Sequence, residues 1–350
     1  MIKTLKNILH QDRDSFRVPR RVQDTVPIKR IWKDGTFLAG NKYSRTFKFT
    51  DINYSVASEA DQLDMFLLYC DLLNSLEVGA TTKITNNNRR VSYRNFAVHL
   101  MELKGDELDR FRVEFNDLLT EAATHGSAIL QEKYVTISVV KRNIEEANIF
   151  FNRVSAEIAS RFAVLSSRMT ELNAYERLRI FHDFFRAGEE ENYMFDFDLS
   201  ARKGHSFIDA IAPSSMSIER DHIRIGDKYA RVLFLKEYPS FLKDSMVREI
   251  CEMQRNMMFS IDIIPVPTEE AVKEVERKLL GTESDITKWQ QQQNKNNNFS
   301  AVVPYALEQQ RKESTEYLND LTNSDQRMMF VTVTAVHMAD TLEELDADAE

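Results

Sequence analysis

The sequence of 350 residues is poor in glycine, and its glycines do not form a phosphate-binding loop. None of the 9 glycines is followed directly by lysine, so the Gly-Lys-Ser/Thr end of a P-loop is absent. The spacings Gly-x-Gly-x-x-Gly and Gly-x-Ser-x-Gly are also missing, which leaves a dinucleotide site and a serine hydrolase without support. A standard nucleotide site, in which backbone N–H groups cradle phosphates, therefore cannot be built from this sequence.

Cysteine and long apolar runs are scarce as well. The 2 cysteines, Cys70 and Cys251, occur in apolar, helix-like contexts, and we expect small buried side chains in a reducing cytoplasm. A disulfide or a catalytic thiol is less favoured, because no neighbouring base is apparent. No apolar run approaches the roughly 20 residues that cross a bilayer. No uninterrupted apolar segment of a secretory signal follows Lys3 and Lys6 either, so the predicted location is the cytoplasm.

Metal-binding and acid/base patterns are also absent. The 7 histidines never occur at i,i+3 or i,i+4 spacing, so the sequence predicts no zinc site. His182 is expected to be packed or at the surface, and not to be a ligand. Asp196 and Asp198 are expected to lie on a solvated strand, not to form an acid/base pair. No catalytic, cofactor-binding or metal-ligating residue is predicted in this chain.

The composition that is present, 43% hydrophobic and 29% charged residues, is typical of a globular protein. The net charge of −9 is unevenly distributed: residues 1–50 carry 12 Lys/Arg and 4 Asp, which leaves 34 basic and 51 acidic residues for the other 300. An acidic body argues against nucleic-acid binding. The basic N-terminal part is expected to meet an anionic surface, either lipid headgroups or an acidic partner. The residues predicted for this contact are Lys3, Lys6, Arg17, Arg20, Arg21, Lys29 and Arg30.

The first ten residues predict a short basic amphipathic helix, in which Ile2, Leu5, Ile8 and Leu9 share one side. Such a helix is too short to be stable alone in water. It needs to dock on the protein's own core, on a partner or on a membrane, and the sequence leaves all three open.

Hydrophobic periodicity and turn residues predict an α+β fold of two mixed α/β sandwiches, with helices packed on mixed sheets and a similar ββαβαβ plan. The predicted organisation is an N-terminal helix and linker (1–25), a first α/β domain (26–186), an irregular connection (187–217) and a second α/β domain (218–350). Hairpin turns are predicted at Asp34-Gly35 and Gly226-Asp227. Three further local predictions concern the asparagines 86–88, which should end a strand, residues 195–198, which should form a short strand, and the polar tract 290–298, which should be a solvated helix or linker.

A short internal similarity suggests that the two halves are duplicates. Lys42–Arg45 and Lys228–Arg231 differ at one position, and each stands on the return strand of a predicted hairpin. The third strands of the two halves, Val135–Val139 and Val331–Ala335, also match in character. A four-residue match is weak by itself, so chance similarity is the alternative.

The C-terminal residues predict the start of a helix, because Thr341 and Glu344 have the spacing of a capping box. No glycine or basic last turn follows before Glu350. We expect the natural sequence to continue beyond this point, with an acidic tail as the alternative.

Five blocks of the sequence resemble one family, and the resemblance covers nearly the whole chain. They are similar to conjugation ATPases of the CagE/TrbE/VirB type from Gram-positive bacteria, which serve type IV secretion. The blocks are Phe37–Asp51, Asn256–Thr268, Trp289–Val303, Glu308–Ser314 and Asp325–Phe330.

This resemblance implies a longer parent protein, whose C-terminal RecA-like motor binds ATP and magnesium and drives DNA transfer. It implies an α+β N-terminal region that docks the motor onto inner-membrane components of the channel and contributes to homo-oligomer contacts. The chain would then lie in the cytoplasm, peripheral to the membrane. None of the family's catalytic residues maps onto this chain, so no ATPase activity is expected of these 350 residues.

Two other classes of function remain as alternatives. One is a stand-alone enzyme with an unrecognised active site. The other is a single-stranded nucleic-acid module that uses Asn86–Arg90, Tyr93 and Arg94 as a basic and aromatic patch.

Overall fold

The computed structural model describes residues 19–90, 100–125, 129–238, 244–296, 298, 302–324 and 326–349. Their contacts define two compact units. The larger, here called the sheet unit, contains the described residues of 16–56, 82–262 and 331–350. The smaller, here called the helical unit, contains those of 57–81 and 263–330. Each unit combines separated stretches of sequence, so these packing units differ from the contiguous first half (26–186) and second half (218–350) that the sequence predicts.

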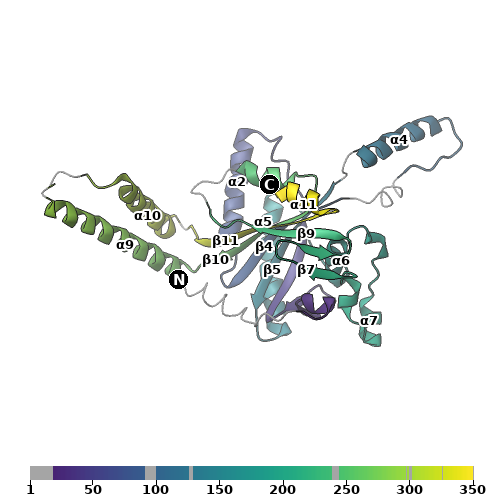
Figure 1. Ribbon diagram of the computed structural model, residues 1–350, viewed down its shortest axis with the longest axis horizontal. Helices are drawn as coiled ribbons and strands as arrows, with labels where there is room; N and C mark the ends of the chain where they lie inside the picture. Colours follow the sequence, from purple (N-terminus) through teal and green to yellow (C-terminus); the bar gives the residue numbers. More distant parts are fainter. Residues whose placement is uncertain are drawn as a thin grey trace. The chain divides into compact units, whose positions relative to one another are not determined.

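Helices and strands are interspersed along the chain (Figure 1). After η1 (Val22–Thr25), the first half contains β1 (Ile28–Ile31), β2 (Phe37–Ala39), β3 (Lys42–Phe49), α2 (Glu59–Asn74), β4 (Ala80–Arg90), α4 (Asp109–His125), β5 (Ile129–Val140), α5 (Ile144–Val164), β6 (Met169–Glu171) and α6 (Ala174–Phe185). The connection contains η2 (Glu190–Asn192), α7 (Phe197–Lys203) and η3 (Phe207–Ala210). The second half contains β7 (Met216–Ile218), β8 (Ile223–Ile225), β9 (Lys228–Phe234), α8 (Asp244–Cys251), β10 (Asn256–Pro265), α9 (Thr268–Lys295), α10 (Tyr305–Asn323), β11 (Met329–Ala339) and α11 (Leu342–Ala349).

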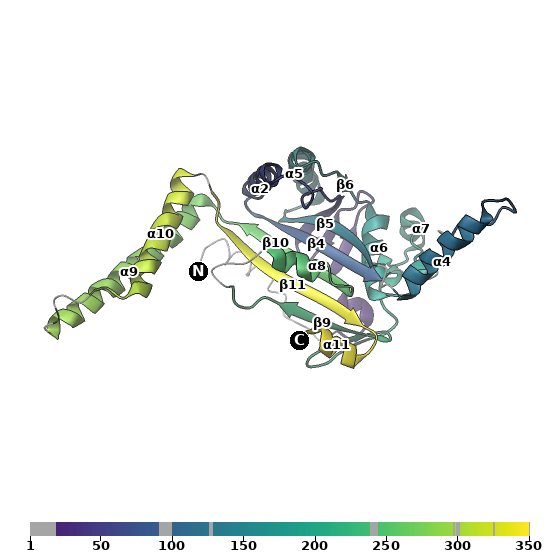
Figure 2. The same ribbon diagram turned by 90° about the horizontal axis from the view of Figure 1, so that it is seen from above.

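The strands of the two halves form one large antiparallel sheet, in the order β1-β2-β3-β5-β4-β10-β11-β9-β8-β7, with β6 added beside β3 (Figure 2). The predicted α+β class is confirmed. The two halves share this sheet instead of forming separate sheets. Because β4 and β10 are neighbours, the backbone groups along the inner edge of each half find partners in the other half.

The strand order repeats between the halves. The order β2-β3-β5-β4 in the first half corresponds to β8-β9-β11-β10 in the second. Tyr43 follows Gly40 by three residues and pairs with Val139, and Tyr229 follows Gly226 by three residues and pairs with Ala339. Order and register therefore both support the structural duplication.

This register corrects one detail of the predicted repeat. It makes Ala335–Ala339 the equivalent of Val135–Val139, four residues later than the similarity in character suggests. An even shift keeps every side chain on the same face of the sheet, which is why the similarity persists despite the shift.

Alternate residues of β3 point to opposite faces of the sheet. Phe49 packs on Phe162 of α5, with ring centroids 5.1 Å apart, whereas the carbonyl oxygen of Ser44 accepts a 2.7 Å hydrogen bond from Arg177 of α6. In the second half, Arg231 bonds Asp346 of α11 at 2.6 Å, and Ala230 belongs to a core cluster that Phe184 of α6 joins. Helices α5 and α11 therefore lie on one face, and α6 lies on the other.

Two buried arginines hold the hairpin β1-β2 to the rest of the first half. Arg45 forms ion pairs with Asp34 at 2.7 Å and Glu171 at 2.9 Å. Arg177 donates to the carbonyl oxygen of Gly35 at 2.6 Å. Gly35 has φ +83°, and a Cβ atom there would lie 2.0 Å from a backbone oxygen, so only glycine fits this turn.

The helical unit contains the pair α9 and α10, which lie side by side (Figures 1 and 2). Val266, Ala271, Val275 and Leu321 form its buried cluster. Helix α9 is continuous from Thr268 through Gly281 to Lys295. The tract from Gln290 onward is mostly exposed within this helix, in agreement with the solvated helix predicted there.

Two local predictions were wrong for tertiary reasons. The three asparagines 86–88 do not end β4, because the Asn88 side chain finds partners within the fold: it donates to the carbonyl oxygens of Cys251 and Met253 at 2.6 and 3.2 Å. Residues 195–198 are not a strand, because the Asp196 side chain accepts from the backbone N–H of Leu199 at 2.8 Å and caps α7.

Candidate functional site

The basic residues predicted to contact a partner or a membrane lie near one edge strand of the sheet. Arg20 and Arg21 are exposed directly before η1, and Lys29 and Arg30 are exposed on β1. Charged side chains on an edge strand also discourage pairing with other chains. Lys3, Lys6 and Arg17, together with the predicted helix of residues 1–9, lie outside the described residues. The contact itself stays a prediction.

The alternative nucleic-acid patch does not form as predicted on the described residues. Asn86, Asn87 and Asn88 are buried, and Arg89 is paired with Asp183 at 2.6 Å. Tyr93 and Arg94 lie outside the described residues. Stacking and phosphate contacts need accessible side chains, which the three asparagines do not provide.

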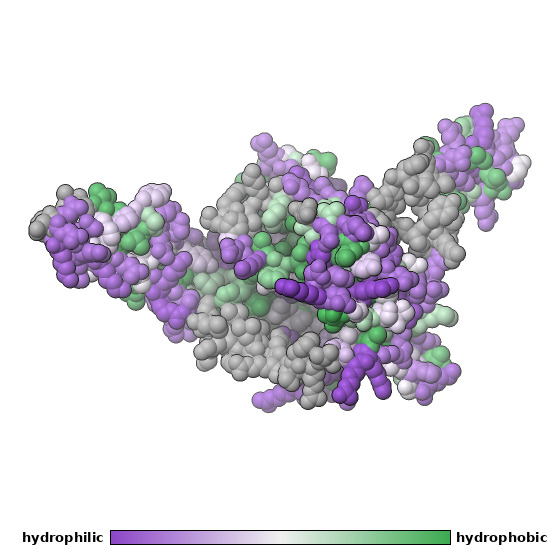
Figure 3. Space-filling view, viewed as in Figure 1, coloured by the Kyte–Doolittle hydropathy of each residue, from purple (hydrophilic) through white to green (hydrophobic). Residues whose placement is uncertain are grey.

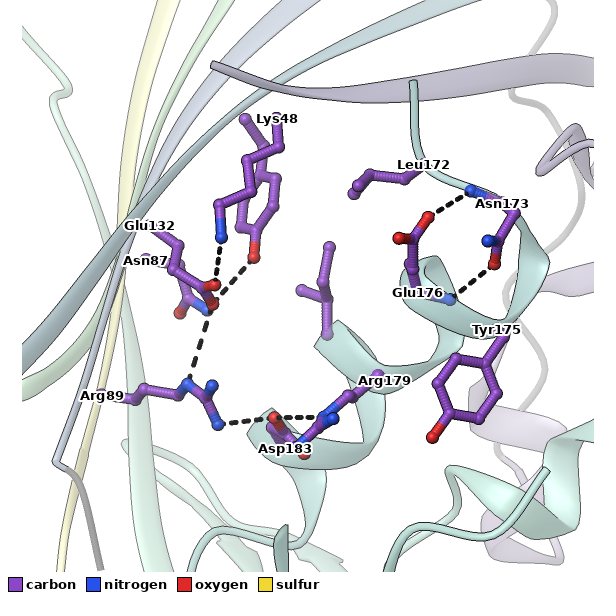
Figure 4. A pocket seen from close by; sticks show the side chains of 12 residues that line it. Lys48, Asn87, Arg89, Glu132, Leu172, Asn173, Tyr175, Glu176, Arg179 and Asp183 are labelled. Atoms are coloured by element: carbon purple, nitrogen blue, oxygen red, sulfur yellow. Dashed lines mark hydrogen bonds and ion pairs between the residues drawn. The ribbon is translucent and has the colours of Figure 1, made fainter. Parts of the chain in front are cut away.

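A polar cavity of about 490 Å³ lies between the sheet and α6 (Figure 4). Strands β3, β4 and β5 supply one side of it, and α6 with the residues before it supplies the other. Its charged members are three cations and three carboxylates: Lys48, Arg89, Arg179, Glu132, Glu176 and Asp183.

Alternation along the strands explains why these side chains converge. Lys48 on β3 lies opposite Tyr134 on β5, so both point to the α6 face, together with Glu132 two residues earlier. Arg179 and Asp183 are one helical turn apart on α6 and present the same side of the helix to the cavity. The cavity is thus made by the pleat of the sheet and the pitch of the helix together.

The ionic groups form one connected network. Glu132 accepts from Lys48 Nζ at 2.7 Å and from the Tyr134 hydroxyl at 2.9 Å. Arg89 links the two acids, since its Nη1 lies 2.6 Å from Asp183 and its Nε lies 3.8 Å from Glu132. The opposite side of Asp183 meets His182 Nδ1 at 3.2 Å.

These contacts shift the pKa values of Glu132 and Tyr134. Burial alone would raise the pKa of Glu132, but the hydrogen bonds from Lys48 and Tyr134 outweigh it, so this pKa lies below its ordinary value. Burial, reinforced by the negative charge of Glu132, raises the pKa of Tyr134. Glu132 is therefore an ionised acceptor at neutral pH, and Tyr134 is a neutral donor.

The network ties the sheet to α6 and keeps a polar cavity open. The carboxylates of Glu132 and Asp183 both already accept hydrogen bonds, so neither is placed to act as a general acid. His182 is packed, as the sequence predicts: it is 1% exposed, and its ring centroid lies 5.0 Å from that of Tyr193. The geometry favours a structural tie over a reaction centre.

In the described portion, no group of three or more His, Cys, Asp or Glu side chains is arranged to hold a metal ion. None of the described helices combines the length and the apolar character that crossing a bilayer requires.

Sequence reasoning missed the cavity because its members come from four separate elements. The one local signal was a lysine at position 48 between two phenylalanines, which indicates a strand with a charged face. Nothing local connects Lys48 with Glu132, 84 residues away, or Arg89 with Asp183, 94 residues away.

Two helices leave apolar side chains in solvent, and Figure 3 shows such side chains among the polar ones of α4. Along α4 and the residue before it, Leu108, Phe111, Phe115 and Leu118 are 41–60% exposed. Along α2, the exposed side chains are Leu63, Phe66, Leu67 and Tyr69. Apolar faces of this extent are typical of surfaces that bind another protein.

No family model matches the chain, and no curated protein matches it.

Proposed function

We propose that this chain is a docking and oligomerisation region of a conjugative DNA-transfer ATPase. It would lie at the cytoplasmic face of the cell membrane and connect a motor to channel components. ATP and magnesium belong, in this proposal, to the motor and not to these residues. The family assignment rests on the sequence blocks that resemble conjugation ATPases.

The observation that carries the docking role is the pair of exposed apolar helix faces. A protein that acts alone has no use for two phenylalanines and two leucines in solvent along one helix, because their exposure costs free energy and invites aggregation. A protein that binds partners gains from the same side chains when they are covered. The exposed basic residues Arg20, Arg21, Lys29 and Arg30 add an electrostatic contribution toward an anionic surface.

A stand-alone enzyme is the second candidate, and the polar cavity is the observation in its favour. Its size suits a small molecule, and its lining is both basic and acidic. If it were an active site, Glu132→Gln would abolish an activity and leave membrane association intact. In the docking proposal, Glu132→Gln changes stability alone.

The decisive experiment measures membrane association of the whole chain. Purified protein is floated with membranes from cells that express the channel genes of a conjugative element and with membranes from cells that lack them. We expect flotation only with the former. Reversing the four described basic residues, Arg20, Arg21, Lys29 and Arg30, to Glu should reduce the floated fraction at least tenfold, since each contributes roughly 1 kcal/mol near an anionic surface.

Matched controls separate this effect from net charge. Lys288 on α9 and Lys312 on α10 are exposed in the helical unit and do not belong to the edge strand, and their reversal to Glu should leave flotation unchanged. Equal flotation with both kinds of membrane would show binding to lipid and not to channel components. Turnover of ATP by the purified chain would overturn the docking proposal.

A further inference from the structure

The polar cavity between the sheet and α6 exposes its cations more than its central carboxylates. The side chains of Lys48 and Arg179 are 48% and 47% exposed, whereas those of Glu132 and Asp183 are 16% and 5% exposed. Figure 4 shows Lys48 on the sheet side of the cavity and Arg179 on the helix side. A molecule that enters the cavity therefore meets a positive charge on either side.

Both cations retain N–H groups for another acceptor. Lys48 Nζ donates a hydrogen bond to Glu132 at 2.7 Å, and an ammonium group has three donors. Arg179 Nε lies 3.6 Å from Asp183, which is too long for a hydrogen bond. The buried carboxylates thus keep the two cations beside the cavity and leave donors of both free to bind a ligand.

A buried amide also lines the cavity. Asn87 on β4 is 6% exposed, and none of the described residues forms a hydrogen bond with its side-chain amide. A buried polar group without a partner is unfavourable unless water or a ligand supplies one. The amide can donate to the same acceptors as the two cations.

The remaining lining indicates the body of a ligand. Leu172, Ile180, Tyr134 and Tyr175 supply apolar carbon surface. The volume of about 490 Å³ lies within the range of small-molecule sites and exceeds what a single inorganic anion fills. The cavity therefore suits an organic molecule that carries an anionic group.

One exposed carboxylate limits the negative charge that a ligand can carry. Glu176 lines the cavity at the start of α6, and its Oε2 accepts from the backbone N–H of Asn173 at 2.8 Å. The charge of Glu176 repels any anionic group placed close to it. A ligand with one anionic end and an uncharged body avoids this repulsion.

We propose that this cavity binds a small organic anion, whose single carboxylate or phosphate group is held by Lys48, Arg179 and the amide of Asn87. The two cations have long, partly exposed side chains that can turn toward one group. Carboxylate and phosphate oxygens are both strong acceptors for lysine and arginine, so the lining fits either group. The site goes beyond the docking role, which gives these residues no ligand, and it requires no reaction.

The test is isothermal titration calorimetry of the whole chain at low ionic strength. The probes are benzoate and hexanoate as carboxylates, phenyl phosphate and glycerol phosphate as phosphates, and benzyl alcohol as an uncharged control. We expect at least one of the four anions to bind with a Kd below about 1 mM, and benzyl alcohol not to bind. Tighter binding of the carboxylates or of the phosphates identifies the anchoring group, and either result supports the proposal.

Charge-neutral variants of the lining should change the affinity in opposite directions. Lys48→Gln and Arg179→Gln each remove a positive charge from a half-exposed position, so each should weaken binding of the tightest probe roughly fivefold or more. Glu176→Gln removes the repelling charge and keeps an acceptor for the Asn173 N–H, so it should tighten binding about twofold. A general loss of structure would weaken binding in all three variants, and that result overturns the proposal.

Arg161 on α5 provides a matched control on the opposite face of the sheet. Like Arg179, it is partly exposed, at 40%, and it lies near an acid one turn away on its own helix, Glu157 at 3.9 Å. Arg161→Gln should leave binding unchanged, and weakening equal to that of Arg179→Gln would show a general charge effect and overturn the proposal. Absence of binding by all four anions up to about 10 mM also overturns it. Membrane flotation tests the docking role separately, so the two proposals can fail independently.

Discussion

The two halves of the molecule have the same strand order and the same register, yet their helical cover differs. In the first half a 21-residue helix seals one face of the sheet, and Phe47 and Val135 lie almost fully buried beneath it. In the second half α8 and α11 lie over the equivalent strands, and Leu233 remains 39% exposed. One sheet plan therefore carries a closed face over Phe47 and a partly open face over Leu233. The same strand order and register do not by themselves decide how completely a face of the sheet is covered.

The largest expected change in the free energy of unfolding distinguishes two equivalent apolar positions, Phe47 and Leu233. Phe47→Ala should lower the free energy of unfolding by about 3–5 kcal/mol, because the ring is buried and its removal leaves a cavity. Leu233→Ala should cost about 1 kcal/mol, because this side chain is already partly in solvent. Urea unfolding of the two variants measures both values. Equal losses would contradict the assignment of closed and open faces.

The turns provide the second test. Gly35→Ala should cost about 3 kcal/mol or more, because a Cβ atom at φ +83° would lie 2.0 Å from the Leu172 oxygen. Gly226 also has positive φ, but a Cβ atom there would meet only Ser214 Oγ, at 3.5 Å. Gly226→Ala should therefore lower the free energy of unfolding by about 1–2 kcal/mol. The difference between the two midpoints in urea reports the crowding of the first hairpin. A smaller loss for Gly35→Ala than for Gly226→Ala would refute this account.

Equivalent arginines give the third and smaller contrast. Arg45→Met should cost about 2 kcal/mol, because it removes a side chain buried among Asp34, Thr36 and Glu171 and leaves their oxygens without a donor. Arg231→Met should cost about 0.5 kcal/mol, because its partner Asp346 is mostly in water. Thermal unfolding of the two variants, with the wild type as reference, checks the order.

The smallest expected effect is a pH dependence of stability, and it is expected from Glu132 in the polar cavity of the first half. The folded-state pKa of Glu132 is depressed below 4.5, so its contribution to stability is present above the unfolded-state value and is lost as pH falls through the folded-state value. The wild type should be more stable than Glu132→Gln at pH 7, and the gap should shrink as the pH falls below about 4.5. The equivalent residue of the second half is Thr332, which does not titrate, so Thr332→Val provides the matched control. A gap that is constant with pH would show that Glu132 acts through packing.

Local signals in the sequence were reliable, and contacts between distant residues were not. The helix start at Thr341 and the turn at Gly226 were predicted correctly, because a cap or a turn depends on residues within four positions. Asn88 was wrongly assigned to the end of a strand, because its burial depends on the carbonyl oxygens of Cys251 and Met253.

Several properties of the fold and of the site depend on pairing that no local pattern encodes. The sequence predicts two similar halves but not their union, since the pairing of β4 with β10 joins strands about 170 residues apart. The polar cavity was missed for the same reason, because Lys48 and Glu132 meet only when β3 pairs with β5. The basic residues Lys29 and Arg30 were found as exposed charges, but their position on an edge strand follows only from the strand order.

The seam between β4 and β10 has a practical consequence for any attempt to study one half alone. The outer edges of the sheet are short, with 4 residues in β1 and 3 in β7, whereas the seam joins strands of 11 and 10 residues. A cut in the connection 187–217 would turn one of these long inner strands into an unprotected border with free backbone donors and acceptors. Recombinant halves should therefore precipitate or pair with each other when refolded together, and the smallest well-behaved fragment should retain both halves of the seam.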